Sequence, residues 1–183
     1  MKFKAIFLDK DGTIIPDIPY NVNTELIALS EGALEGLQLF QSYGYLLVII
    51  TNQSGVALGY FSLDEVEKVK TALNNICALN GIYLDGFYCC PHHADDNCEC
   101  RKPKPGLLLK AADEMNIDLS GSWMIGDILN DVEAGKKAGC KTVLIENGNE
   151  TEWIMNDYRF PDHKAGNLAD AAKYILMEEY GVE

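Results

Sequence analysis

The sequence predicts an α/β protein built around a mainly parallel sheet with helices on both faces. Short apolar segments alternate along the chain with segments of helical spacing, an order typical of βαβ units. The segment Tyr45–Thr51 is almost continuously apolar, as expected of a strand covered by helices on both faces. Acidic or polar residues follow several of the apolar segments directly, and open α/β sheets bind ligands at the carboxyl ends of their strands.

Each predicted strand is a short apolar run bounded by polar residues or glycine. In chain order the strands are expected at Phe3–Leu8, Tyr45–Thr51, Phe87–Cys89, Trp123–Ile125 and Thr142–Ile145. The order of strands and helices requires crossover connections, which places the strands parallel to one another in one sheet.

The predicted helices follow from apolar spacing and from residues that start or stop helices. Ser62 and Glu65 form a capping-box pattern, Pro105 suits a first helical turn, Gly139 suits a helix end, and Asn167 suits a cap. The helices are therefore expected at residues 31–42, 62–80, 105–115, 130–138 and 167–180.

Length and charge limit the possible functions. The 183 residues suit a single domain, residues 1–183, with an inserted loop at 90–104 and no room for a large cap. The net charge of −13 disfavours nucleic-acid and anionic membrane partners. The apolar runs are too short to span a bilayer, and the N-terminus lacks a signal-peptide pattern. We expect a cytoplasmic monomer that acts on a small molecule.

The carboxylates Asp9 and Asp11 directly follow the first predicted strand and precede Gly12-Thr13. Residues two positions apart in a strand point to the same side, so both carboxylates can converge at the sheet edge. One carboxylate can bind a cation and attack phosphorus while the other transfers a proton. By itself the pattern also fits an ordinary Asp-rich turn after a strand.

Two further polar segments follow predicted strands. Thr51 to Gly55 (Thr-Asn-Gln-Ser-Gly) offers hydroxyl, amide and backbone donors that suit a phosphate group, although polar strand exits are common. Asp127 and Asp131 follow the strand at Trp123–Ile125, where an acid can join Asp9 around Mg²⁺ or can simply cap a helix. Arg101-Lys102 supplies the positive charge that a transferring phosphoryl group requires.

These motifs, in the order DKDGT, ITNQSG, RKPKPG and IGDILND, resemble the haloacid dehalogenase superfamily of phosphatases over residues 6 to about 145. The resemblance implies its three-layer Rossmann-like fold with a minimal cap. It implies Asp9 as the nucleophile that forms an aspartyl-phosphate and Asp11 as general acid and base. Thr51 and Lys102 would hold the phosphoryl oxygens. Substrate contacts are expected at Asn52, Gln53, Ser54, Arg101 and Lys102.

The same resemblance implies a catalytic Mg²⁺ ion. Its ligands would be the Asp9 and Asp127 carboxylates and the backbone carbonyl of Asp11, with Asp131 in an outer shell. Lys10 stands where arginine is usual in the family, a difference that the sequence does not explain.

A cysteine- and histidine-rich loop predicts a structural Zn²⁺ site. Three thiolates and one imidazole form a tetrahedral ligand set with no position left open for catalysis. The alternative is a group of free thiols beside surface histidines. Cys89 and His93 are expected to lie outside the ligand set, which comprises Cys90, His92, Cys98 and Cys100.

A minimal-cap phosphatase with such a loop resembles the D,D-heptose 1,7-bisphosphate phosphatases and the related histidinol-phosphate phosphatases. The leading expectation is a Mg²⁺-dependent D-glycero-D-manno-heptose 1,7-bisphosphate 7-phosphatase. Leu58 and Tyr60 replace basic residues that the heptose enzymes are expected to use for the second phosphate, and Arg101 and Lys104 would partly compensate. The short zinc-loop spacing instead resembles the histidinol-phosphate branch.

Two alternatives come from other classes of protein. A non-catalytic, zinc-stabilised interaction module would retain the fold, although the acidic and basic residues that the chemistry needs are all present. A nucleic-acid 3′-phosphatase is disfavoured by the charge of −13 and the absence of a basic stripe.

Overall fold

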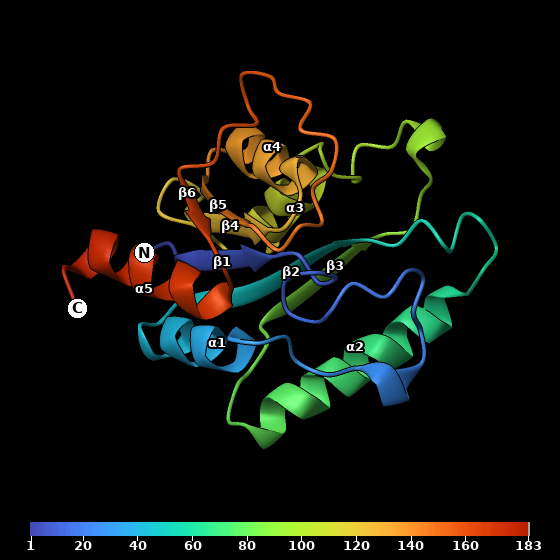
Figure 1. The fold of residues 1–183 in the computed structure, drawn as a ribbon, viewed down its shortest axis with the longest axis horizontal. Coiled ribbons are helices and arrows are strands. Elements are labelled where there is room, and N and C mark those ends of the chain that lie inside the picture. Colours follow the sequence, from blue (N-terminus) through green and yellow to red (C-terminus); the bar gives the residue numbers. More distant parts are fainter. Residues whose placement is uncertain (183) are drawn as a thin grey trace.

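A computed structural model describes residues 1–182 as a six-stranded parallel sheet with the strand order β3-β2-β1-β4-β5-β6 (Figure 1). The strands are β1 (Ala5–Leu8), β2 (Leu46–Asn52), β3 (Gly86–Cys90), β4 (Trp123–Gly126), β5 (Lys141–Ile145) and β6 (His163–Ala165). The helices are α1 (Ala33–Ser42), α2 (Leu63–Leu79), α3 (Gly106–Glu114), α4 (Leu129–Ala138) and α5 (Leu168–Tyr180), with short 3₁₀ helices η1 (Thr24–Leu26) and η2 (Ala94–Asp96).

The predicted fold class is confirmed, and each predicted strand and helix is present. The capping box at Ser62 and Glu65 forms as expected, and the Asn167 side chain accepts a hydrogen bond from the backbone of Asp170. Strand β6 was not predicted, because its three residues contain a histidine and a lysine and carry no apolar run. Helix α4 begins at Leu129, one residue earlier than expected.

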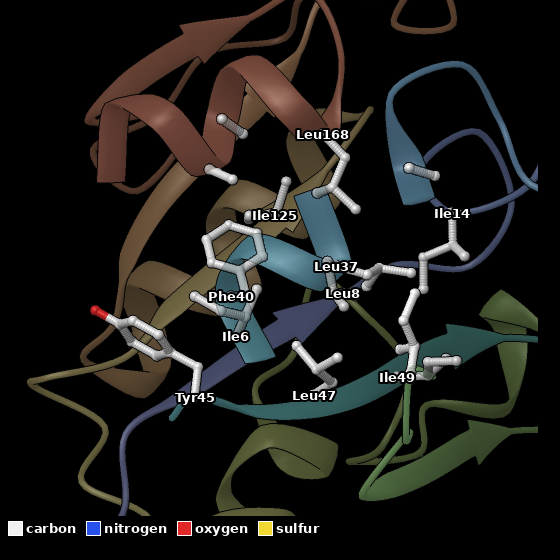
Figure 2. Close-up of a cluster of buried hydrophobic side chains, with 14 of the residues drawn as sticks. Ile6, Leu8, Ile14, Leu37, Phe40, Tyr45, Leu47, Ile49, Ile125 and Leu168 are labelled. Carbon is white, nitrogen blue, oxygen red and sulfur yellow. The ribbon is translucent and has the colours of Figure 1, made fainter. Parts of the chain in front are cut away.

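Helices cover both faces of the sheet. One core joins the sheet to α1, α2 and α5 and includes Ile6 and Leu8 of β1 together with Leu37 and Phe40 of α1 (Figure 2). A second core joins the opposite face to α3 and α4 through the alternate strand residues, among them Phe7 of β1. The strands therefore have apolar side chains on both faces, as their continuous hydrophobicity predicted.

The parallel topology brings several loops to one edge of the sheet. Leu8 at the end of β1 is in register with Ile49 of β2 and Ile125 of β4, so the residues that follow these strands are neighbours. Asp9 follows β1, Asn52 ends β2, and Asp127 follows β4. No helix among the described residues is long and apolar enough to cross a membrane.

Candidate active site

Asp9 and Lys102 form the centre of the site. The backbone amide of Asp9 donates to the Ile125 carbonyl of β4 (2.9 Å), which fixes the aspartate at the sheet edge. Lys102 Nζ lies 2.6 Å from Asp9 Oδ1 and 2.7 Å from Asp131 Oδ1, and it donates to the Ile50 carbonyl at 2.8 Å. Because the lysine is only 3% exposed, both ion pairs are held in a region poor in water.

Asn52 at the end of β2 holds the loop residue Lys102 in place. Its side-chain amide donates to the Lys102 carbonyl, and its oxygen accepts from the Lys102 backbone amide, both at 3.1 Å. This two-point contact joins the loop before α3 to the sheet. The predicted substrate residue Asn52 therefore also positions the predicted phosphate-binding lysine.

Three carboxylates surround this centre, and two of them, Asp9 and Asp131, pair with the Lys102 ammonium group. Burial, and then the neighbouring carboxylates, raise the pKa of Asp127 to about 8. Burial also raises the pKa of Asp9 to about 6, although Lys102 acts against that rise. For Lys102 itself, burial disfavours the charge, but Asp131 and Asp9 outweigh it and raise its pKa. The centre thus carries more negative charge than its lysine neutralises.

That excess of negative charge fits a divalent cation. One oxygen from each of Asp9, Asp127 and Asp131 lies within 4.8 Å of the others. A donor set made only of oxygen atoms suits Mg²⁺, which also retains several waters. A bound cation would favour the ionised carboxylates that burial otherwise disfavours.

Gly12 is required where the turn after β1 approaches Asp127. Its φ of +82° lies in the left-handed region, and a Cβ atom added there would lie 2.0 Å from Asp127 Oδ2. The Gly12 carbonyl also accepts a hydrogen bond from Asn147 Nδ2 at 2.7 Å. The glycine of the DKDGT motif therefore permits close packing of two acidic segments.

Asp11 lies beside the centre with a partner for each carboxylate oxygen. Lys10 Nζ donates to Oδ1 at 2.9 Å, and Gln53 Nε2 donates to Oδ2 at 3.0 Å. The side chain remains 28% exposed and lines the cavity, so solvent and substrate can reach it. The buried Lys10, which the sequence left unexplained, thus pairs with the predicted acid–base residue.

An open cavity of about 360 Å³ lies over these groups. The predicted substrate residues Asn52, Gln53, Ser54, Arg101 and Lys102 all line it, as do residues 17–21. Thr51 differs: it is 0% exposed, and its hydroxyl accepts a hydrogen bond from Gln53 Nε2 at 2.8 Å. Thr51 is not among the described residues that line the cavity, and its contact with a phosphoryl oxygen stays a prediction.

Leu58, Tyr60 and Lys104 are not among the described residues that line this cavity. The Tyr60 ring packs edge-on against Tyr20, a cavity residue, with centroids 4.9 Å apart. Lys104 Nζ lies 2.9 Å from Glu99 Oε1 and so contacts the cysteine-rich loop. Four positions are candidates for binding the second phosphate: 58, 60, 101 and 104. Of these four, only Arg101 places a cationic side chain along the cavity wall.

Several residues after β5 were missed by sequence reasoning. Asn149 Nδ2 donates to Asp127 Oδ2 at 2.7 Å, and Glu150 Oε2 accepts from the backbone amide of Leu129 at 2.7 Å. With Asn147, they hold the Gly12 turn, the Asp127 carboxylate and the start of α4. The signal was present, because polar residues directly follow a predicted strand here as they do at the other segments.

The predicted zinc ligands come together at the end of β3. Cys90, His92, Cys98 and Cys100 form a cluster in which each neighbouring pair of Sγ or Nδ1 atoms lies between 3.0 and 3.6 Å apart. Ligands of a tetrahedral Zn²⁺ lie roughly 3.5–3.8 Å apart, whereas a disulfide requires about 2.05 Å. Cys89 and His93 are outside the cluster, as predicted.

Comparison with known proteins decides the family. A family model for HAD-like hydrolases matches residues 99–171. A D-glycero-beta-D-manno-heptose-1,7-bisphosphate 7-phosphatase of Pasteurella multocida is 46% identical over 152 residues, covering 79% of this chain and 83% of the relative. The chain belongs to the HAD-like hydrolase family. A relative of the same name from Haemophilus ducreyi is 40% identical and covers 94% of this chain and 98% of its own length.

Solved structures agree with this family. The D,D-heptose 1,7-bisphosphate phosphatase of B. bronchiseptica, determined with magnesium and phosphate, has a TM-score of 0.86 and 30% identity, covering 96% of this chain and 99% of that one. A HAD-like phosphatase from Mesorhizobium loti has a TM-score of 0.82 and 29% identity, covering 95% and 86%. The predicted family resemblance, fold and phosphatase class are confirmed.

Proposed function

We propose that this HAD-like phosphatase removes the 7-phosphate of D-glycero-D-manno-heptose 1,7-bisphosphate through an aspartyl-phosphate on Asp9. The observation that carries the chemistry is the placement of Asp9 against Lys102 and beside Asp127 at the floor of an open cavity. The heptose substrate is supported by the names of relatives that align over most of both chains.

In this proposal a carboxylate oxygen of Asp9 attacks phosphorus and the sugar oxygen leaves. Asp11 protonates that oxygen and then removes a proton from the water that hydrolyses the aspartyl-phosphate. Lys102 stabilises negative charge on the phosphoryl oxygens from its fixed position. Mg²⁺, held by Asp9, Asp127 and the Asp11 carbonyl, would polarise the phosphoryl group and neutralise charge.

The phosphate that is not cleaved needs its own cationic contact. Arg101 supports this role because it lines the cavity next to Lys102, and its Nη1 atom donates to the His92 carbonyl at 3.2 Å. The same contact joins Arg101 to the cysteine-rich loop. We therefore propose that Arg101 binds the second phosphate in place of the basic residues absent at positions 58 and 60.

The substrate proposal is tested by ranking kcat/KM for the heptose bisphosphate, heptose and hexose monophosphates, and histidinol phosphate with Mg²⁺ present. We expect the heptose bisphosphate to rank first. A wide preference for histidinol phosphate would reject the heptose assignment but retain the phosphatase, and no hydrolysis of any ester would reject both.

We further propose that the cysteine cluster holds one structural Zn²⁺. The thiolate and imidazole donors and their mutual distances support this assignment. The metal would hold residues 90–104 as a compact loop, and Arg101 and Lys102 emerge directly from it. Gly106, at the start of α3, packs so closely on this loop that an added Cβ would lie 2.1 Å from the Glu99 carbonyl oxygen.

Cys98→Ser is expected to lose the zinc and to lower the melting temperature, because structural zinc contributes directly to folding. Metal content measured by mass spectrometry and Tm measured by calorimetry check this. Cys89→Ser is the matched control, because Cys89 is the neighbouring cysteine outside the cluster. A wild-type protein without zinc, and equal Tm values for wild type and Cys98→Ser, would contradict the proposal.

Asn149→Leu is expected to weaken Mg²⁺ binding by about 10–100-fold, since partners that orient a metal ligand typically have effects of this size. The change removes the donor that holds Asp127 Oδ2 and leaves the carboxylate free to rotate. Titration calorimetry with Mg²⁺ alone measures the effect, and Asn80→Leu at the end of α2 is a control remote from the site. An affinity within twofold of wild type would show that Asn149 does not orient Asp127.

A further inference from the structure

The segment between β5 and β6 passes over α4 (Figure 1). Arg159 of this segment binds two side chains of α4, Glu133 and Asn130. Arg159 Nε lies 2.5 Å from Glu133 Oε2, and its Nη1 donates to the Ile154 carbonyl at 3.1 Å. Its Nη2 donates to Asn130 Oδ1 at 2.8 Å. Each nitrogen of the guanidinium therefore has its own acceptor, and the side chain is only 16% exposed.

Glu133 is a fixed anchor for this arginine. It is buried in α4 and also accepts from Lys137 Nζ at 2.6 Å and from Asn156 Nδ2 at 3.2 Å. Burial opposes its charge, but these donors together lower the pKa of the carboxyl group. A charged, fully engaged carboxylate holds the guanidinium in one orientation, because the planar fork of arginine matches carboxylate geometry.

The orientation of Arg159 fixes the amide of Asn130. An arginine has only donors, so the Asn130 atom that faces it must be the oxygen. The Asn130 NH₂ group then points away from Arg159, and no hydrogen bond among residues 1–182 uses it. Asn130 lines the active-site cavity. The Asn130 side chain thus lines the cavity and carries an NH₂ group that has no acceptor among residues 1–182.

We propose that Asn130 is a substrate-binding residue that donates to a hydroxyl of the sugar, and that Arg159 is its positioning residue. This inference rests on the proposed function, because it assigns a contact to the leaving group of that reaction. Arg159 acts only through Asn130: it is not among the described residues that line the cavity.

The surroundings favour a hydroxyl over a phosphate at this position. Asn130 is flanked along the chain by Asp127 and Asp131, whose carboxylates repel a phosphate that Mg²⁺ does not neutralise. The cationic side of the cavity is formed by Arg101 and Lys102 instead. A neutral amide donor is suited to the polyol part of a substrate, whose oxygens carry no charge.

Asn130 is not needed to cap its helix. The Leu129 amide at the start of α4 is bound by Glu150, and the Ile128 amide donates to Asp131 Oδ2 at 3.3 Å. Among residues 1–182, the Asn130 side chain makes one hydrogen bond, to Arg159. The contact between these two residues therefore orients the Asn130 amide at the cavity wall and does not cap the helix.

The test compares kcat/KM for the heptose bisphosphate with kcat/KM for p-nitrophenyl phosphate, which has no sugar hydroxyls. In the Mg²⁺-loaded full chain, Asn130→Ala is expected to lower the ratio of these two constants about tenfold, the typical effect of one hydrogen bond to a neutral group. Arg159→Gln is expected to lower the same ratio, and the double variant is expected to match Asn130→Ala. Asn156→Ala, which removes a donor to the same Glu133 oxygen without contacting Asn130, should keep the wild-type ratio.

Separate results would overturn the inference and the proposed function. If the wild type hydrolyses both esters and Asn130→Ala keeps its ratio, Asn130 does not bind the sugar and the inference fails alone. If the effects of Arg159→Gln and Asn130→Ala simply multiply, or if Asn156→Ala lowers the ratio equally, Arg159 is structural rather than positioning. A wild type that hydrolyses p-nitrophenyl phosphate but not the heptose ester overturns the proposed substrate and the inference together.

Discussion

Asp9→Asn is expected to abolish turnover of every phosphate ester. An amide cannot attack phosphorus or form the acyl phosphate, and it is a poorer ligand for Mg²⁺ than a carboxylate. The loss should exceed the ~10²–10⁴-fold that removing general acid–base help typically causes. Initial rates of phosphate release from the heptose bisphosphate and from p-nitrophenyl phosphate measure it.

The neighbouring variant Asp11→Asn separates the two roles. It keeps the nucleophile and should retain residual turnover, slowed within the ~10²–10⁴-fold range. Far-ultraviolet circular dichroism and Tm should confirm that both variants fold. Substantial turnover by folded Asp9→Asn would identify a different nucleophile and reject the proposed chemistry.

Lys102→Met is the second change with a large expected effect. It removes the ammonium that pairs with Asp9 at 2.6 Å and Asp131 at 2.7 Å and leaves both buried carboxylates uncompensated. Breaking a buried ion pair on one side typically costs about 3–5 kcal/mol of stability. Loss of the phosphoryl contact should further lower kcat by about 10²–10³-fold.

Lys104→Met is a matched control for that change. This lysine lies two positions along the same loop, and its Nζ atom contacts Glu99 at the surface. We expect its Tm, measured by calorimetry, to stay close to wild type, since exposed ion pairs contribute roughly 0–1 kcal/mol. If Lys102→Met were no more harmful than Lys104→Met in both Tm and kcat, the buried lysine would have neither proposed role.

Much of the fold could be predicted because the sheet is parallel and covered on both faces. Apolar runs such as residues 45–51 then have no polar face to obscure them, and caps such as Ser62 mark the helix starts. Strand β6 could not be found in this way, because an edge strand of three residues that contains His163 and Lys164 has the composition of a loop. Its pairing with β5 depends on the rest of the sheet.

Part of the candidate site could likewise be predicted from the sequence, and part could not. Asp9, Asp127 and Lys102 belong to local motifs, and the structure brings them together. Asn149 lies in a polar segment that directly follows a predicted strand, but its contact with Asp127, 22 positions away, could not be predicted from that pattern. Arg159 contacts Asn130 from 29 positions away, and no local pattern marks it. The roles assigned to all of these residues stay predictions until the variants are measured.

The central claim is that this chain is a 7-phosphatase of heptose 1,7-bisphosphate, and product regiochemistry tests it most directly. Phosphorus NMR of the heptose bisphosphate, incubated with the wild-type protein and Mg²⁺, resolves the C7 ester from the anomeric phosphate. The account predicts that the C7 resonance disappears as inorganic phosphate forms, while the anomeric resonance remains. Loss of the anomeric phosphate first, or no phosphate release under conditions where another ester is hydrolysed, would contradict it.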